Sequence, residues 1–195
     1  MISPSQPDLL SVDWSLIPAP ADDGAARHLT GALVPDIALA ATDGSSVSLS
    51  RRAGRSVVFA FPRTGRPGAI SPVADWDLIP GARGCTPQAC AFRDLHAALA
   101  AAGADRVYGL STQDSDYQRE AVERLHLPFA LLSDAEHALT DAARLPWFEA
   151  GGLRLLRRLA LIIDGGRISH VFYPVFPPDR NADDVRRWLE ENRRS

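Results

Sequence analysis

The sequence contains no lysine: all 21 of its basic residues are arginine. This absence excludes a Schiff base on a lysine amine and the lysine of a phosphate-binding loop. Long apolar runs are absent too, since about 18 consecutive apolar residues, the length of a membrane span, occur nowhere. The N-terminal stretch MISPSQPDLLSVDW lacks a basic region followed by an apolar run and does not predict a signal peptide. No membrane association is expected, and a cytoplasmic location is the default.

Cysteine is scarce as well, with only Cys85 and Cys90 in the chain. Persistent disulfides are rare in the cytosol, so the two thiols favour a catalytic or redox-sensing role over a structural bridge. No further ligands stand at zinc spacing from them and the five histidines are scattered, so no metal site is expected. A net charge of −3 provides no basic field for nucleic acid. The expected partner is a small molecule or another protein.

The 195 residues suffice for one sizeable core and are too few for two comfortable domains. Residues 35–195 are predicted to form the domain, because apolar periodicity becomes regular from there on. Residues 1–34 are predicted to form an N-terminal arm that packs on the domain through four apolar anchors: Leu10, Trp14, Ile17 and Leu29. A long loop rich in Gly and Pro lies between Pro62 and Gly84, with three possible packing anchors: Trp76, Leu78 and Ile79.

The order of predicted elements indicates an α/β fold. Two short strands are expected around a turn at Asp43, and SVVFAF follows as a strand buried on both faces. The stretch TPQACAFRDLHAALAAAGA predicts a helix that Gly103 ends. Strands and helices then alternate, DAEHALTDAARL being a helix capped by Ser133 or Asp134, and a hairpin leads to a last helix beginning at Asn181. This order predicts a central mixed sheet flanked by helices.

The spacing of the two cysteines is incompatible with a disulfide inside an intact helix. If the helix begins near Cys85, that residue lies on the stripe that faces the core, in line with Phe92 and Leu99. Cys90 is then about 140° further round and roughly 7.5 Å along the axis, whereas a disulfide needs Cα atoms within about 7 Å and converging Cβ vectors. The pair can close only if the first turn unwinds.

The residues around Cys85 suit such a change. Gly84 before it and Pro87 after it are typical of a first turn that is readily remade. Because Cys85 would lie among unpaired backbone N–H groups at a helix start, its thiolate is favoured. An accessible thiolate with a second cysteine nearby is typical of a thiol that peroxide oxidises to sulfenic acid and that the second thiol resolves. The alternative, that Cys85 and Cys90 are small apolar residues on an Ala-rich helix, stays open.

The stretch GCTPQACAFRD closely resembles the active-site helix of the peroxiredoxins, in particular their bacterioferritin comigratory protein, or Q-type, branch. The resemblance extends over the order of elements from about Pro35 to the C-terminus, including VVFAFP and RLALIID. It implies a thioredoxin-like fold, with Cys85 as the peroxidatic and Cys90 as the resolving cysteine. The family arginine that holds the thiolate and polarises the peroxide matches Arg158, and Arg157 would point to the other face of the strand.

The sequence departs from the family motif Pro-x-x-x-Thr-x-x-Cys. Pro62 lies 23 positions before Cys85 instead of seven, which indicates an insertion of about sixteen residues in the loop 65–83, and Ala82 occupies the threonine position. Thr64 and, as a weaker substitute, Thr86 are candidates for the missing hydroxyl, and Arg66 and Arg83 for added charge. The expected substrate-binding residues are Thr64, Gly84 and Thr86. We expect the insertion to roof the pocket and tune substrate access.

These observations predict a thiol-dependent peroxidase. Cys85 would attack hydrogen peroxide or an organic hydroperoxide, Cys90 would condense with the sulfenic acid, and an external dithiol, thioredoxin by family analogy, would reduce the disulfide. The resemblance requires no metal, haem or flavin, and the chain is expected as a monomer or homodimer. The first alternative is a weakly active or non-enzymatic thioredoxin-fold redox sensor or binding module. A dithiol oxidoreductase is less favoured, because such enzymes use Cys-x-x-Cys.

Overall fold

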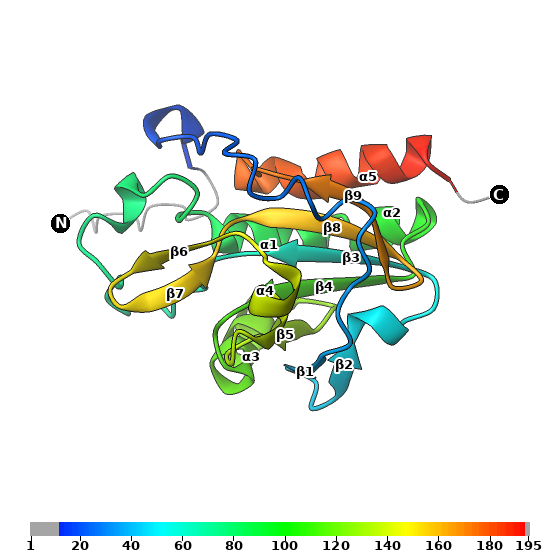
Figure 1. Cartoon of the computed structure of the whole chain (residues 1–195). Helices are drawn as coiled ribbons and strands as arrows, with labels where there is room; N and C mark the ends of the chain where they lie inside the picture. Colours follow the sequence, from blue (N-terminus) through cyan, green and yellow to red (C-terminus); the bar gives the residue numbers. More distant parts are fainter. Residues whose placement is uncertain (1–11, 194–195) are drawn as a thin grey trace.

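A mixed sheet of seven strands forms the centre of the structure, a computed structural model that describes residues 12–193 (Figure 1). The strand order is β2-β1-β5-β4-β3-β8-β9. β3, β4 and β5 run parallel, whereas β8 and β9 continue the sheet antiparallel on the other side of β3. The strands of this sheet are β1 Ala38–Ala41, β2 Ser46–Ser48, β3 Arg55–Ala60, β4 Arg106–Ser111, β5 Leu131–Ser133, β8 Leu159–Asp164 and β9 Arg167–Phe172.

Helices supply apolar side chains to both faces of the sheet. One core cluster joins the sheet to α1, α2, α3 and α5, and a second joins the opposite face to α4 and to the N-terminal segment. The α-helices are α1 Cys85–Asp94, α2 His96–Ala101, α3 Ser115–Leu125, α4 Ala138–Ala143 and α5 Asn181–Glu191. Short 3₁₀ helices are η1 Trp14–Leu16, η2 Leu49–Arg51, η3 Trp76–Leu78 and η4 Pro178–Arg180. The predicted mixed sheet flanked by helices is confirmed.

Strand β3 is the apolar axis of the fold. All of its residues are buried, and successive side chains alternate between the two clusters: Val57 and Phe59 join the first, Val58 and Ala60 the second. In the first cluster Phe59 stacks on Phe92 of α1 with ring centroids 4.2 Å apart. This contact fixes α1 against the sheet and thereby determines where both cysteines lie.

Several predicted elements differ in detail. The helix expected over TPQACAFRDLHAALAAAGA is divided into α1 and α2 at Leu95, where ψ is 7° instead of a helical value. The helix expected from Asp134 begins only at Ala138; the Asp134 carboxylate still caps it, by accepting from the N–H groups of Leu139 and Thr140. Leu78 was expected as a packing anchor and is 67% exposed, so that prediction was wrong.

An additional antiparallel hairpin, β6 Trp147–Ala150 with β7 Leu153–Leu156, forms a separate two-stranded sheet that the sequence pattern did not predict. Its turn contains Gly151, whose φ of +59° is in the left-handed region. The inserted loop packs against this hairpin: the ring of Trp76 lies 6.3 Å from that of Phe148, and a Cβ on Gly151 would come within 2.7 Å of the Pro72 carbonyl oxygen. The hairpin therefore supports the inserted loop.

The N-terminal segment from residue 12 to residue 34 lies on the domain surface (Figure 1). Leu29 is buried in the second core cluster, and Trp14 packs edge to face on Phe176 with centroids 6.0 Å apart. The Trp14 indole N–H also donates to Asp179 at 2.9 Å. The expected anchor Leu10 lies outside the described residues. These contacts bring the segment beside the start of α1.

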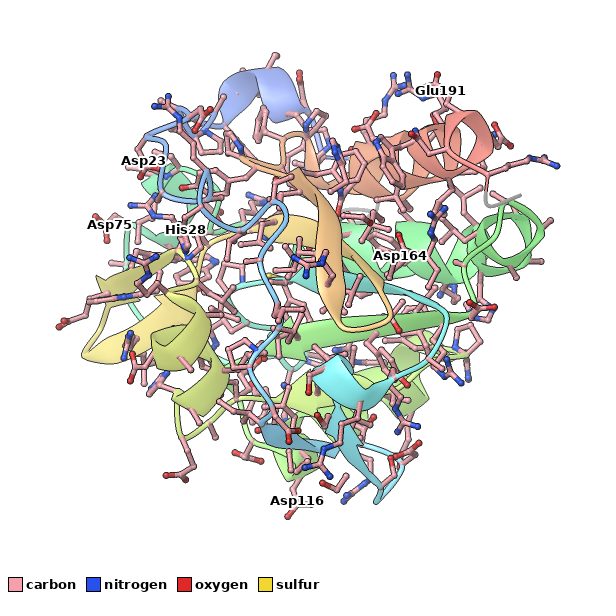
Figure 2. All side chains as sticks on the ribbon, turned by 45° about the vertical axis from the view of Figure 1, so that its right-hand side comes forward. Asp23, His28, Asp75, Asp116, Asp164 and Glu191 are labelled. Atoms are coloured by element: carbon pink, nitrogen blue, oxygen red, sulfur yellow. The ribbon has the colours of Figure 1, made fainter. Side chains whose placement is uncertain are left out.

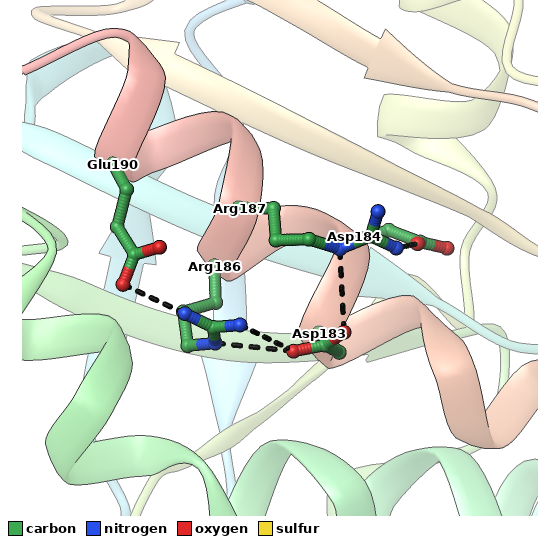
Figure 3. A network of polar contacts seen from close by, with 5 residues as sticks. All are labelled: Asp183, Asp184, Arg186, Arg187 and Glu190. Carbon is green, nitrogen blue, oxygen red and sulfur yellow. Dashed lines mark hydrogen bonds and ion pairs between the residues drawn. The ribbon is translucent and has the colours of Figure 1, made fainter.

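The last helix carries a network of ion pairs on its outer side (Figure 3). Arg186 bridges Asp183, one turn earlier, and Glu190, one turn later, at 2.8 and 2.7 Å, and Arg187 pairs with Asp183 and Asp184. The two aspartates lie in the first turn of α5, where the helix dipole favours negative charge. Each pair is partly exposed and contributes little alone, so α5 is held mainly by its buried residues Val185 and Leu189.

Truncation of Phe59 should destabilise the protein strongly. Phe59 is fully buried and contacts Phe92 and Phe129, so Phe59→Ala opens a cavity between β3 and α1. We expect a loss of about 3–5 kcal/mol in the free energy of unfolding, measured by urea denaturation. The control is Ile70→Ala in the inserted loop, where the side chain is 94% exposed and the change should stay within about 0.5 kcal/mol. Equal effects of the two substitutions would contradict this account of the core.

Candidate active site

Cys85 is the first residue of α1, and the glycine before it allows a close approach of other chain segments. Gly84 has a φ of +108°, which side-chain-bearing residues rarely adopt. A Cβ at this position would lie 2.6 Å from Pro178 and 2.8 Å from Trp14. The backbone at the helix start is therefore held between η4 and the N-terminal segment, and this requires glycine.

The sulfur of Cys85 lies against a buried guanidinium. Arg158, only 2% exposed, donates from Nη2 to Cys85 Sγ at 3.3 Å. The same Nη2 lies within 3.2–3.3 Å of three carbonyl oxygens of the loop before the helix, those of Gly81, Ala82 and Arg83. The Cys85 thiol is also within 3.8 Å of the Ala82 oxygen. A fixed positive charge at this distance stabilises the thiolate, which is the nucleophilic form of cysteine.

Gln88 holds the guanidinium from the other side. Its Oε1 accepts from Arg158 Nη1, and its Nε2 donates to Asn181 Oδ1 at 2.9 Å. Gln88 and Asn181 are 0% and 1% exposed, so the chain Asn181–Gln88–Arg158 is a buried polar network. Within the described residues, the Nε of Arg158 has no hydrogen-bond partner. The sequence analysis missed both residues. The signal available was a polar residue three positions after Cys85, on the helix side that faces the core.

A cavity of about 160 Å³ opens above the sulfur. Its wall combines charged and apolar side chains with backbone of the helix start: Val12, Arg63, Gly65, Trp76, Ala82, Arg83, Gly84, Cys85, Thr86 and Pro87. Four of these, Gly65, Trp76, Ala82 and Arg83, come from the inserted loop. Residues far apart in the sequence thus meet at one thiol.

Only some of the residues expected to bind substrate line the cavity. Gly84 and Thr86 line the cavity, but Thr64 does not; its N–H and hydroxyl both donate to Gln113 Oε1, at 2.7 and 3.2 Å, and it is 1% exposed. Arg83 lines the cavity as expected, whereas Arg66 lies over the Tyr117 ring, 4.2 Å from its centroid, and is not part of the wall.

Cys90 lies one and a half turns along α1, in the first core cluster, and is a free thiol like Cys85. Burial raises the pKa of the Cys90 thiol; Arg93 and Arg124 lower it and Asp94 raises it, each by less than the burial does. Cys85 and Cys90 belong to the same core cluster, and α1 is a continuous helix over both of them.

Residues 12–193 contain no group of three or more His, Cys, Asp or Glu side chains that could hold a metal ion. Figure 2 shows Asp23, Asp75, Asp116 and Glu191 spread around the outline of the molecule.

In the same described part of the chain, no helix is long and apolar enough to span a membrane.

A free cysteine at a helix start, 3.3 Å from a buried arginine and beside a mixed sheet, is the candidate active site of this thioredoxin-like fold. Residues 29–186 match the Redoxin family. The chain is 32% identical over 167 residues to Peroxiredoxin Bcp of Escherichia coli (strain K12), covering 83% of this chain and 96% of that protein. It is 30% identical over 167 residues to the chloroplastic Peroxiredoxin Q of Suaeda salsa, covering 85% and 69%.

Among solved structures, peroxidoxin BcpB of Mycobacterium tuberculosis is similar, with a TM-score of 0.67, 27% identity and coverage of 85% of this chain and 98% of that one. Peroxiredoxin Q of Xanthomonas campestris shares the fold with a TM-score of 0.64 at 21% identity, over 81% of this chain and 92% of that one. The chain belongs to the peroxiredoxin family, in its Q-type or bacterioferritin comigratory protein branch. Its class of activity is thiol-dependent reduction of peroxides, and the expected thioredoxin-like fold is confirmed.

The buried network around Gln88 should be energetically coupled. Gln88→Leu leaves Arg158 Nη1 and Asn181 Oδ1 without their shared partner, so we expect a loss of about 2–3 kcal/mol in the free energy of unfolding. Asn181→Leu should cost less, and the double variant less than the sum of the two, with a coupling of about 1 kcal/mol. Urea denaturation of the four proteins measures this cycle. Strict additivity would contradict the network.

Proposed function

We propose that Cys85 is the peroxidatic cysteine of this peroxiredoxin. Its thiolate attacks the distal oxygen of a hydroperoxide, the O–O bond breaks, and the sulfur becomes sulfenic acid. The departing hydroxide or alkoxide takes up the proton that the thiol released on ionising, and it leaves as water or an alcohol. The observation that carries this proposal is the 3.3 Å contact of Arg158 Nη2 with Cys85 Sγ. Held by Gln88 and the loop carbonyls, Arg158 has little freedom to reorient, so its charge is in place before negative charge develops on the leaving oxygen.

Cys90 then resolves the sulfenic acid. Its thiol condenses with Cys85 sulfenic acid, water leaves and a disulfide forms, which an external dithiol such as thioredoxin reduces by exchange. In the helical state the two Cα atoms are about 7.5 Å apart along the axis, too far for a disulfide. The first turn of α1 must therefore open, and this breaks the contacts of Gly84 with Trp14 and Pro178 and those of Gln88 with Arg158.

The rest of the chain supports this site. Residues 1–34 act as an arm on the domain 35–195, and the described part of this arm packs beside the start of α1. The inserted loop 65–83 acts as the roof of the cavity through Trp76 and Arg83. Thr86 and the backbone at Gly84 contact the hydroperoxide, and Thr64 acts indirectly, by fixing the loop through Gln113.

A second candidate function is a redox sensor with slow chemistry. Ala82 occupies the position of the family threonine, and the hydroxyl of Thr64 is engaged by Gln113 outside the cavity. Thr86 is the remaining hydroxyl in the wall. Slow oxidation of Cys85 with the same disulfide product would favour the sensor over the peroxidase.

Intact mass after one equivalent of hydrogen peroxide tests the cycle. We expect the parent protein to lose two hydrogens as the disulfide forms, Cys90→Ser to gain one oxygen at Cys85, and Cys85→Ser to stay unchanged. Each variant differs from the parent by one sulfur, so each serves as a control for the other. A parent protein that stays reduced after prolonged exposure would overturn the proposal.

Removing the guanidinium should slow the first step. Arg158→Met takes away the charge next to Cys85 Sγ, so the second-order rate of Cys85 oxidation should fall by about 10²–10³, the loss typical for one preorganised donor. The matched control is Arg157→Met, because Arg157 is not part of the wall around Cys85; it lines a small neighbouring cavity that Arg158 also borders. Stopped-flow tryptophan fluorescence measures both rates, and an equal decrease in the two variants would contradict the assignment of Arg158.

Cys90 should react slowly while α1 is folded. Burial raises its pKa and lowers its thiolate fraction at neutral pH, so in Cys85→Ser iodoacetamide should alkylate Cys90 more slowly than in the urea-unfolded variant. The rate should rise with pH with a midpoint above the value of about 8.5 for an ordinary thiol. Mass spectrometry of timed samples measures this, and alkylation as fast as in urea would contradict a buried resolving cysteine.

A further inference from the structure

One arginine in the cavity wall has no role in the cycle above. Arg63 lines the cavity and makes no ion pair with any residue of the described range 12–193. Its contacts are with Tyr117 of α3: Nη2 donates to the hydroxyl at 3.4 Å, and the guanidinium carbon lies 5.8 Å from the ring centroid. Arg63 is thus positioned by an aromatic ring.

The other charges near the cavity are already engaged. Arg83 pairs with Asp77 at 2.7 Å, and Arg158 is bound to Gln88, to the loop carbonyls and to the sulfur. On the far side of Arg63 lies a second cavity of about 470 Å³, where the carboxylate of Asp114 caps α3 by accepting from the Tyr117 N–H. The wall facing Cys85 therefore carries one arginine that forms no ion pair with a carboxylate of residues 12–193.

Apart from Arg63, Arg83 and Thr86, the side chains of the wall other than Cys85 are apolar. Val12, Trp76, Ala82 and Pro87 supply carbon surface, and Trp76 is supported from behind by Phe148. A volume of about 160 Å³ is well below the ~300–1,000 Å³ of sites for drug-sized ligands. The cavity suits a short organic group that has apolar carbon on one side and an anion on the other.

We propose that the preferred substrates are small organic hydroperoxides that carry one carboxylate. This inference rests on the proposed function of Cys85. The carbon skeleton packs on Val12 and Trp76, the carboxylate binds the Arg63 guanidinium, and the hydroperoxide is presented to Cys85. Arginine suits this task because its planar donors match a carboxylate with two parallel hydrogen bonds. The carboxylate is unchanged in the reaction: the thiol gains one oxygen, and the hydroperoxide leaves as the corresponding alcohol.

A matched pair of substrates tests the inference. tert-Butyl hydroperoxide and 3-hydroperoxy-3-methylbutanoate differ only by a carboxylate on one methyl group, and stopped-flow fluorescence gives the second-order rate of Cys85 oxidation by each. In the parent protein the carboxylate compound should react roughly five- to tenfold faster, as expected for one partly buried charged pair. The ratio should decrease in 1 M salt, because screening weakens the attraction.

Two variants locate the effect. Arg63→Gln should bring the ratio of the two rates to about one, whereas Arg66→Gln, which removes the same charge three residues away but outside the wall, should keep most of it. A ratio near one in the parent, with rapid oxidation by both compounds, would overturn this inference and leave the peroxidase function standing. An equal loss in both variants would overturn the assignment to Arg63. Failure of both compounds to oxidise Cys85 would overturn the proposed function itself.

Discussion

The burial of the Arg158 guanidinium is the constraint on which the site depends. A charge that is 2% exposed loses its water and must regain equivalent partners from the protein. They come from three directions: the carbonyls of the inserted loop, the side chain of Gln88 on α1, and the sulfur of Cys85. Asn181 extends the network to α5. The bonds of Nη1 and Nη2 of this one cation thus fix the loop, the helix start and the last helix relative to one another, while Nε has no partner among the described residues.

Much of the fold could be predicted because its strongest elements are locally specified. The apolar run of β3, the pattern that places Phe92 toward the core and the turn of the β8–β9 hairpin all follow from spacing and turn chemistry, and each lies where it was expected. The proximity of Arg158 to Cys85 followed from the resemblance to peroxiredoxins, and the geometry agrees with it. The prediction of one continuous helix was wrong at Leu95, where the chain divides into α1 and α2. Nothing in the Ala-rich sequence around this residue indicates the break.

The remaining features depend on contacts between distant segments, which composition does not encode. Gln88 looks like an ordinary helix-forming residue until Arg158 and Asn181 are placed beside it. The β6–β7 hairpin could not be predicted from its own residues, because it packs against the inserted loop through the contact of Phe148 with Trp76. Thr64 was expected in the substrate site because it directly follows Pro62 and Arg63 in the sequence. In the structure its hydroxyl donates to Gln113 instead. In each of these cases, a contact with a residue far away in the sequence determines where the side chain lies.

The make-up of the cavity wall has a consequence for how its chemistry responds to acidity. Among the described residues that line it, the charged side chains are Arg63 and Arg83, and Arg158 lies beneath. Guanidinium groups stay protonated throughout the range in which thiols ionise. The wall contains no histidine, carboxylate or phenol from the described part of the chain. The charge carried by the described residues of the wall other than Cys85 is therefore the same in mild acid and in mild base, so the field that they present to an incoming substrate does not depend on acidity.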